Sequence, residues 1–284
     1  MRNNIRTKQA LFIAAIVLLV GFLFTREIKG LVVPKDKESA QMPTQPAEKI
    51  SIEEVSATAK NLVSAAIAKD ITALETTYKS ASETGKIANA KQLAQKWDDV
   101  EQAAPSAMYL EVVAKAEPNL TNWLNAGGRF LKAFENTQDS LTLPVMLQKA
   151  NVAFTKALAI DRASLDAKTG LGITIVNGMG APMQGIAMLL DVVKKDPKNL
   201  KANMNLGMFA IKSGQFDKAI TRFNNIIANI KATPDAYFYL ATAYENLGKN
   251  TQAIDAYLSS KKLAANPTLS SFIDKKVAEL KNKR

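Results

Sequence analysis

Small residues recur along the chain at a near-constant interval, and a large apolar residue follows each of them four positions later. The small residues Ala150, Gly185, Ala219 and Ala253 are spaced by 35, 34 and 34 residues. The large residues that follow them are Phe154, Leu189, Phe223 and Tyr257. A spacing of four puts both members of a pair on one face of a helix. Repetition at about 34 residues is typical of stacked helical hairpins, so the pattern predicts an all-α solenoid.

The first half of each interval carries its own small residues. Leu206–Gly207 and Leu240–Ala241 lie 34 residues apart, as do Gly214 and Gly248. We expect the small residues to let the two helices of a hairpin approach closely, with the large aromatic side chains filling the adjoining holes. Gly214 and Gly248 are expected in short turns between the helices. Further upstream, Ala107 indicates an earlier, degenerate hairpin whose first helix spans about 86–102.

One segment carries an almost complete repeat signature. Trp123-x2-Ala126-Gly127-x2-Phe130 is followed by Ala150-x3-Phe154, close to the pattern Trp-x2-Leu-Gly-x2-Tyr and Ala-x3-Phe. Residues 85–267 therefore resemble tetratricopeptide-repeat (TPR) proteins, and the whole chain resembles their membrane-anchored bacterial type. The resemblance implies about four to five hairpins with a concave surface for other proteins.

Two segments depart from the regular spacing. Ala107 and Ala150 are 43 residues apart, which leaves nine extra residues; we expect these in a long inter-helix loop within 131–146 that ends at Pro144, a good first helical residue. The sequence Asn-Gly-Met-Gly-Ala-Pro at 177–182 differs from the short turns expected at Gly214 and Gly248.

Helices are predicted on both sides of the repeats. Residues 51–84 are interpreted as an N-terminal helical cap with an apolar stripe that includes Leu62. Residues 268–284 predict a C-terminal capping helix, because a solenoid needs a polar-faced helix to close its open end. The residues of this helix expected to face inward are Phe272, Ile273, Val277 and Leu280.

The N-terminal region predicts a membrane anchor. Residues 10–24 form an unbroken apolar run between Lys8 and Arg26, so 9–25 are assigned as a transmembrane helix, after a basic tail at 1–8 and before a flexible, proline-containing linker at 26–50. A cleaved signal peptide is the alternative. The residues after the run, Arg-Glu-Ile-Lys at 26–29, are a poor cleavage region, which favours the anchor.

Basic residues flank the run on both sides in nearly equal number, so charge alone does not fix its orientation. Long domains that follow a first helix translocate largely regardless of charge. We therefore expect a single-pass protein of the bacterial inner membrane whose repeats face the periplasm.

The composition narrows the possible chemistry. The chain has no cysteine and no histidine, which removes disulfides, thiolate nucleophiles, the commonest general base and the commonest metal ligand. The clustered carboxylates Asp98, Asp99 and Glu101 are interpreted as a solvated face rather than a catalytic pair. We predict no catalytic residue, cofactor or metal, and a protein that is not an enzyme.

The net charge of +11 is concentrated at the two ends of the chain. Residues 1–50 contain eight Lys or Arg and four Asp or Glu, and residues 268–284 contain five and two. The intervening part has 24 basic and 20 acidic residues, a net of only +4. A nucleic-acid binder would need a basic stripe on the folded body, so nucleic acid is not a predicted partner.

The resemblance also places residues on the concave groove, through the positions of the first helix that face it in TPR proteins. An alternative is that several of these side chains simply pack within the superhelix. The middle of the set is apolar and contains methionine, which favours an apolar segment or helix as the ligand and argues against a clamp for a terminal carboxylate. The set is Leu124, Leu131, Ile173, Val176, Lys201, Met204, Met208, Ile211, Phe238 and Thr242.

These features predict a membrane-tethered scaffold or adaptor that docks a protein segment reversibly, with no covalent step. Tethering raises the effective concentration of the scaffold for membrane-bound partners. One alternative is a self-associating structural component whose groove holds a neighbouring copy, so the oligomeric state stays open. The resemblance to anchored bacterial repeat proteins also implies, as a further alternative, an accessory role in the assembly of envelope complexes, such as those of cytochrome c maturation.

Overall fold

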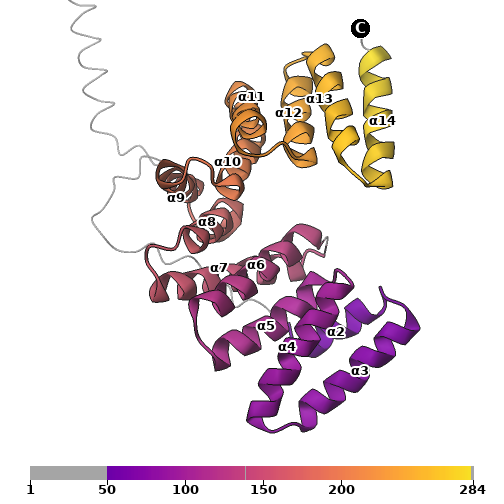
Figure 1. Cartoon of the computed structure of the whole chain (residues 1–284), viewed down its shortest axis with the longest axis vertical. Helices are drawn as coiled ribbons and strands as arrows, with labels where there is room; N and C mark the ends of the chain where they lie inside the picture. The colour runs from indigo at the N-terminus through magenta and orange to yellow at the C-terminus, as the bar shows by residue number, and fades with distance from the viewer. Residues whose placement is uncertain (1–49, 138, 283–284) are drawn as a thin grey trace, which may run out of the picture. The chain divides into compact units, whose positions relative to one another are not determined.

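The computed structural model describes residues 50–137 and 139–282. The chain divides into two compact units, 1–41 and 42–284, and only the second contains described residues. Within the described part all regular structure is helical (Figure 1). In chain order the helices are α2 (Ile52–Lys60), α3 (Ala65–Ser80), α4 (Glu83–Asp99), α5 (Ala103–Ala116), α6 (Leu120–Asn136), α7 (Thr142–Ile160), α8 (Leu165–Thr174), α9 (Pro182–Lys195), α10 (Leu200–Lys212), α11 (Phe216–Asn225), α12 (Pro234–Asn246), α13 (Asn250–Leu263) and α14 (Pro267–Asn282), with π-helical turns η1 (Ile175–Met179) after α8 and η2 (Ile226–Ile230) after α11.

Five helical hairpins follow one another, namely α4–α5, α6–α7, α8–α9, α10–α11 and α12–α13 (Figure 1). The two helices of each hairpin pack together, and the second helix also contacts the first helix of the next hairpin. First helices meet as well, since α8 contacts α6 and α10, and α10 contacts α12. This succession is the predicted all-α solenoid of stacked hairpins. Helices α2 and α3 precede it, and α14 packs on α13 at its end.

The first helix of a hairpin begins at a side-chain cap. Asn119, Ser164, Asn199 and Thr233 precede α6, α8, α10 and α12, and each side-chain oxygen accepts a hydrogen bond from the backbone N–H three residues later. These caps satisfy amide groups that have no partner within the helix. The second helices of the last two hairpins follow short turns, in which Gly214 and Gly248 have φ of 72° and 69°. Glycine adopts this left-handed conformation without steric cost, which explains the predicted turns.

The small residues of the repeat allow close helix contact, as the spacing predicted. An added Cβ at Gly207 of α10 would lie 2.6 Å from the ring of Phe223 of α11, well inside normal contact. At Gly185 of α9 it would lie 2.5 Å from the carbonyl oxygen of Gly172 of α8. The rings of Phe154, Phe223 and Tyr257 are all buried, and the ring of Phe154 lies in the same way against Gly127 and Gly170. The glycines therefore let the helices approach closely, and the aromatic rings fill the space that the missing side chains leave.

The nine extra residues do not form the predicted long loop. Helix α6 continues to Asn136 and α7 starts at Thr142, so the connection is short. The extra residues lengthen the helices, which have 17 and 19 residues where α12 and α13 have 13 and 14. Leu131 and Phe134 continue the apolar period of α6, which favours helix through this region. Pro144 is the third residue of α7, where its missing N–H would have no intrahelical acceptor in any case.

The irregular segment at 177–182 is a real departure from the other turns. Helix α8 continues into the π-helical η1, where Gly178 has φ of 133°. Helix α9 then begins at Pro182 in its first position, which suits the fixed φ of proline. Helix α8 therefore ends in a π-helical turn, whereas α10 ends in a short turn that contains Gly214.

The terminal helices differ from expectation at two residues. Leu62 lies in the turn between α2 and α3 and is 70% exposed, so it is not part of the apolar stripe. In α14, Ile273, Val277 and Leu280 are buried, whereas Phe272 is 45% exposed at the edge of the packed face.

The predicted transmembrane anchor at 9–25, together with the tail and most of the linker, lies outside the described residues. Among the helices of residues 50–137 and 139–282, none combines the length and the apolar character needed to cross a bilayer.

Candidate protein-binding surface

Helix α10 has one face in the core and one face that, among the described residues, is only half-buried or exposed. Its core face is buried and consists of Ala202, Asn203, Leu206, Gly207 and Phe209. The predicted groove residues of α10 fall on the opposite side, since successive members are three, four and three residues apart, which follows the helical period. From the N-terminal end they are Lys201, Met204, Met208 and Ile211, joined by Lys212 at the helix end.

The centre of this face is apolar. Met204, Met208 and Ile211 are half-buried, because their inner sides pack against the core formed by the last two hairpins and α14. Their outer sides remain accessible. Methionine side chains adapt their shape to different apolar ligands, and such surfaces are common where a protein accepts a helix. The face can therefore bury an apolar segment without a deep pocket.

A lysine stands at each end of the apolar centre. Lys201 lies over the ring of Phe154, with its Nζ 6.0 Å from the ring centroid. Lys212 donates from Nζ to Oδ1 of Asn177 in η1 at 3.3 Å, and it lies 5.7 Å from the ring of Phe209. Among the described residues neither ammonium group has a carboxylate partner. Both side chains are exposed, so α10 presents two uncompensated positive charges.

On the next first helix, α12, the charge of Glu245 is already paired. Glu245 accepts hydrogen bonds from Tyr257 Oη at 2.7 Å and from Lys276 Nζ of α14 at 2.9 Å. The hydrogen bond to Glu245 raises the pKa of Lys276, which keeps its charge. Burial, together with the carboxylate of Glu245, raises the pKa of the Tyr257 phenol and keeps it neutral. These groups neutralise one another and leave no free charge for a ligand.

Phe238 of α12 is held by aromatic neighbours. Its ring centroid lies 5.5 Å from that of Tyr257 and 5.9 Å from that of Phe272 in α14. Phe272 therefore has a role that its expected inward position did not predict, since it extends the half-exposed aromatic surface from α12 to α14. Thr242 donates from Oγ1 to the carbonyl of Phe238 at 3.0 Å and is half-buried.

The other predicted groove residues separate into two groups. Leu131 of α6 and Ile173 of α8 are each 3% exposed and belong to the core, out of reach of a ligand in this structure. Leu124 of α6 and Val176 of η1 are half-buried against the same core. The accessible part of the predicted set therefore lies mainly on η1, α10 and α12.

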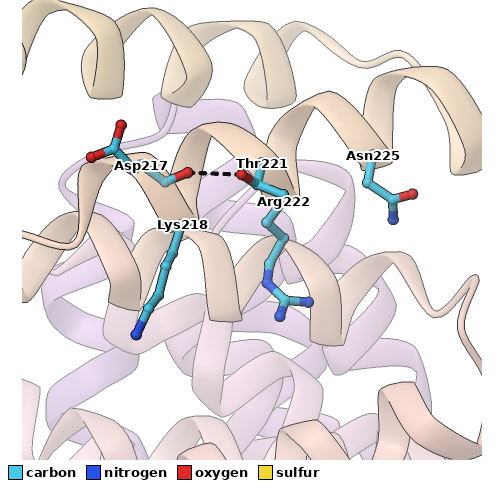
Figure 2. Close-up of a pocket in the computed structure, with 5 residues that line it drawn as sticks. All are labelled: Asp217, Lys218, Thr221, Arg222 and Asn225. Atoms are coloured by element: carbon cyan, nitrogen blue, oxygen red, sulfur yellow. Dashed lines mark hydrogen bonds between the residues drawn. The ribbon is translucent and has the colours of Figure 1, made fainter.

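A polar depression of about 480 Å³ lies on α11. Figure 2 shows its lining residues, Asp217, Lys218, Thr221, Arg222 and Asn225, all from this one helix. Arg222 does not point freely outward, because its Nη1 donates to Oδ1 of the buried Asn203 of α10 at 2.8 Å. Burial lowers the pKa of Arg222, but an arginine stays charged. The depression is a shallow helix face whose main charge is committed to structure.

A second polar cluster surrounds Glu75 of α3. Its carboxylate accepts hydrogen bonds from Ser56 and Lys60 of α2 and, at 3.3 Å, from Tyr109 of α5. Burial raises the pKa of the Tyr109 phenol, so it stays protonated and donates. Each group already has a partner, and the cluster joins α2, α3 and α5. Sequence reasoning missed it because its members are 15 to 34 residues from Glu75 in the chain.

The carboxylates predicted to be a solvated face are only partly so. Asp98 accepts a bond from Arg129 Nη2 at 2.8 Å and its side chain is 18% exposed, which links α4 to α6. Asp99 and Glu101 are exposed, as expected. Across the described ranges, no three acidic side chains converge as a metal site would require.

An outward apolar face on α9 was not predicted. Met183 and Leu190 are 71% and 47% exposed, on the side of the helix away from the buried Leu189. The sequence signal was present, because α9 is apolar on both sides, but repeat periodicity identifies only the packed side.

Comparisons with known proteins agree with this architecture. Residues 235–266 match the family model for the tetratricopeptide repeat. A thermophilic TPR protein of Thermus thermophilus has a TM-score of 0.56 and 16% identity, covering 68% of this chain and 99% of its own. A TPR protein from Parabacteroides merdae also has a TM-score of 0.56, with 12% identity over 83% of this chain and 86% of its own.

A third similar structure is PilW, described as a widely conserved type IV pilus biogenesis factor. It has a TM-score of 0.51 and 20% identity, and the match covers 72% of this chain and 93% of PilW. No curated protein sequence matches the chain. The chain carries a tetratricopeptide repeat at 235–266, and residues over most of its length have the fold that these structures share.

Proposed function

We propose that the chain is a protein-binding scaffold that holds a segment of a partner against the half-buried face of α10 that carries Met204 and Met208, and against the neighbours of that helix. Binding is reversible and involves no covalent step. The observation that carries the proposal is the combination on α10 of half-buried Met204 and Met208 with two lysines that have no carboxylate partner among the described residues. Accessible apolar side chains bordered by charged ones are typical of a surface that a protein ligand covers.

The proposal includes tethering to the bacterial inner membrane through residues 9–25, with the repeats in the periplasm. The apolar run at 10–24 supports the anchor. A tethered scaffold meets membrane-bound partners at high effective concentration. PilW, which shares the fold, is a type IV pilus biogenesis factor, and this supports a role for the chain in the assembly of envelope complexes. Assembly of the complexes of cytochrome c maturation is another role of this kind.

Photocrosslinking tests the binding surface in the full chain. A photoreactive residue replaces Met208 on the proposed surface, and the same residue replaces the exposed Leu258 of α13 as a matched control. Irradiation of native membranes is expected to trap a protein species at position 208 that is not trapped at 258. Equal trapping at both positions, or lipid alone at 208, would contradict the proposal.

The tether is tested separately. The full chain is expected to stay with membranes during alkaline extraction, and a variant without residues 9–25 is expected to be released. External protease added to spheroplasts is expected to digest the repeats. Release of the full chain at high pH would contradict the tether and leave the binding proposal standing.

Self-association is the second candidate, and the outward apolar face of α9 favours it, with Met183 and Leu190 exposed. In that case the mass of the detergent-solubilised full chain increases with concentration, and Leu190→Glu returns it to the monomer. A monomer at all concentrations excludes this candidate.

A further inference from the structure

Lys201 and Lys212 have no carboxylate partner among the described residues, and their spacing and direction indicate the charge pattern of a ligand. Lys201 and Lys212 are eleven residues apart, which is three helical turns and about 16 Å along the axis. Because eleven residues is close to a whole number of turns, both lie on the same side of α10. Met204, Met208 and Ile211 lie between them.

Both lysine heads also lie against earlier parts of the chain, Lys212 at η1 and Lys201 at α7. The Nζ of Lys212 contacts Asn177 of η1, and the Nζ of Lys201 lies over Phe154, whose ring packs against Gly170 of α8. The half-buried Val176 of η1 belongs to the same side. The two positive charges therefore mark the ends of one seam, which runs between α8–η1 and α10.

The present partners of the lysines are replaceable. A hydrogen bond of 3.3 Å to a neutral amide and ring contacts near 6 Å are weaker than a bond to a carboxylate. A ligand carboxylate at each end would therefore find an exposed donor ready to pair. The cost is small, since exposed lysines need little further desolvation.

From these relations, and resting on the proposed function, we infer that the ligand is an amphipathic helix whose apolar stripe is bounded by two acidic residues about three turns apart. A helix fits better than an extended strand, because α10 satisfies its own backbone hydrogen bonds and offers no edge for strand pairing. The spacing of Met204, Met208 and Ile211 by four and three is that of a helix ridge, which packs into the groove of another helix.

The same geometry distinguishes this ligand from a free chain terminus. A terminal carboxylate is a single group, whereas the two lysines are attached about 16 Å apart along the axis of α10, and their ammonium groups lie at Phe154 and at Asn177. The inferred ligand lies inside a longer chain, and its two acidic side chains act together. Recognition then depends on their separation and is independent of whether the peptide ends nearby.

A peptide selection on the full chain tests the inference. The probe is a display library of random peptides, about 16 residues long to cover three turns and flanked on both sides by fixed sequence so that no free terminus is present. Selected peptides are expected to combine a helical apolar stripe with acidic residues about eleven positions apart. Their affinities are then measured with synthetic peptides by fluorescence anisotropy.

Variants assign the charges. Lys201→Gln and Lys212→Gln are each expected to weaken binding about two- to fivefold, and the double variant more. Lys201→Glu/Lys212→Glu should prefer a peptide in which both acidic residues are replaced by lysine. Lys194→Gln on α9 removes the same charge from another exposed lysine and is expected to leave binding unchanged. Circular dichroism confirms that each variant is folded.

The outcomes separate the two proposals. Two results overturn the inference and leave the proposed function standing. In the first, peptides that lose binding in Met208→Glu lack paired acidic residues. In the second, such peptides bind the double lysine variant as tightly as the wild type. Binding that requires a free terminal carboxylate also overturns it. Selection of no peptide that depends on Met208 would refute the inference together with the proposed binding surface.

Discussion

Phe154 of α7 occupies the space that Gly170 of α8 leaves open. A Cβ at position 170 would lie 2.3 Å from its ring, and a Cβ at Gly127 of α6 would lie 2.9 Å from the same ring. One aromatic side chain therefore packs under glycines from two successive first helices. This contact joins the second and third hairpins. Its residues, Phe154, Gly127 and Gly170, are far apart in the sequence.

Gly170→Ala is expected to destabilise the protein. Its methyl group would overlap the buried ring of Phe154, at a cost of about 1–3 kcal/mol, of which the better helix propensity of alanine recovers about 1 kcal/mol. Gly128→Ala is the matched control, because a Cβ there meets nothing within 4 Å. We expect it to raise stability by about 0.5–1 kcal/mol. Thermal melts of both variants in parallel check the prediction, and equal shifts would contradict it.

Substitutions at Gly214 test the cost of backbone conformation without a change in packing. Its φ is 72° and an added Cβ meets nothing within 4 Å. Gly214→Ala should therefore cost about 1–2 kcal/mol from conformation alone, and Gly214→Asn less, because asparagine tolerates the left-handed region better. The free energies of unfolding of the two variants, measured by chemical denaturation, give the comparison. Alanine as stable as asparagine would show that the turn relaxes to another conformation.

The sequence predicted the hairpins because their signal is local and repeated. Ala219 and Phe223 are four residues apart, and so are Ala253 and Tyr257, so one period reveals both the helix and its packed face. The nine-residue insertion was misplaced in a loop because the same period gives no information about helix length. Leu131 and Phe134 were the signal that α6 continues.

The candidate surface was only partly predictable. Family positions identified Lys201 and Met208, but they could not show that Leu131 and Ile173 are buried, because burial depends on how the next hairpin packs. The lack of carboxylate partners for Lys201 and Lys212 among the described residues is also a property of three-dimensional arrangement. Glu245 and Lys276, which pair across 31 residues, show that neighbouring charges can be neutralised in ways the sequence does not display.

Glu111 of α5 is expected to make stability depend on acidic pH. Its carboxylate pairs with Lys149 of α7 at 2.7 Å and with Lys115 at 3.0 Å. Burial acts to raise the pKa of Glu111, but the hydrogen bonds and charges of the two lysines outweigh it and lower the pKa below its ordinary 4.5. A lowered folded-state pKa contributes stability above the unfolded value and loses it as the pH falls through the folded value.

Glu111→Gln should therefore be less stable than the wild type at pH 7, by about 1–2 kcal/mol, and the difference should shrink as the pH falls below about 4.5. Denaturant midpoints measured from pH 7 to pH 3 follow this change. Glu135→Gln, on an exposed residue of α6, controls for the loss of a charge and is expected to have little effect. A difference at Glu111 that stays constant down to pH 3 would contradict the assignment.

Leu131 and Met208 were predicted together as groove residues, and their different burial leads to opposite expectations. Leu131 is 3% exposed in the core, so Leu131→Ala should cost about 2–5 kcal/mol through lost burial and the cavity it leaves. Met208 is half-buried with an accessible outer side, so Met208→Ala should cost about 1 kcal/mol or less and act mainly on binding. Thermal melts of the full chain, together with affinities for the selected peptides, separate the two effects. If Leu131→Ala were as stable as the wild type and lost binding, the surface would include the second hairpin, and the boundary drawn at η1 and α10 would be wrong.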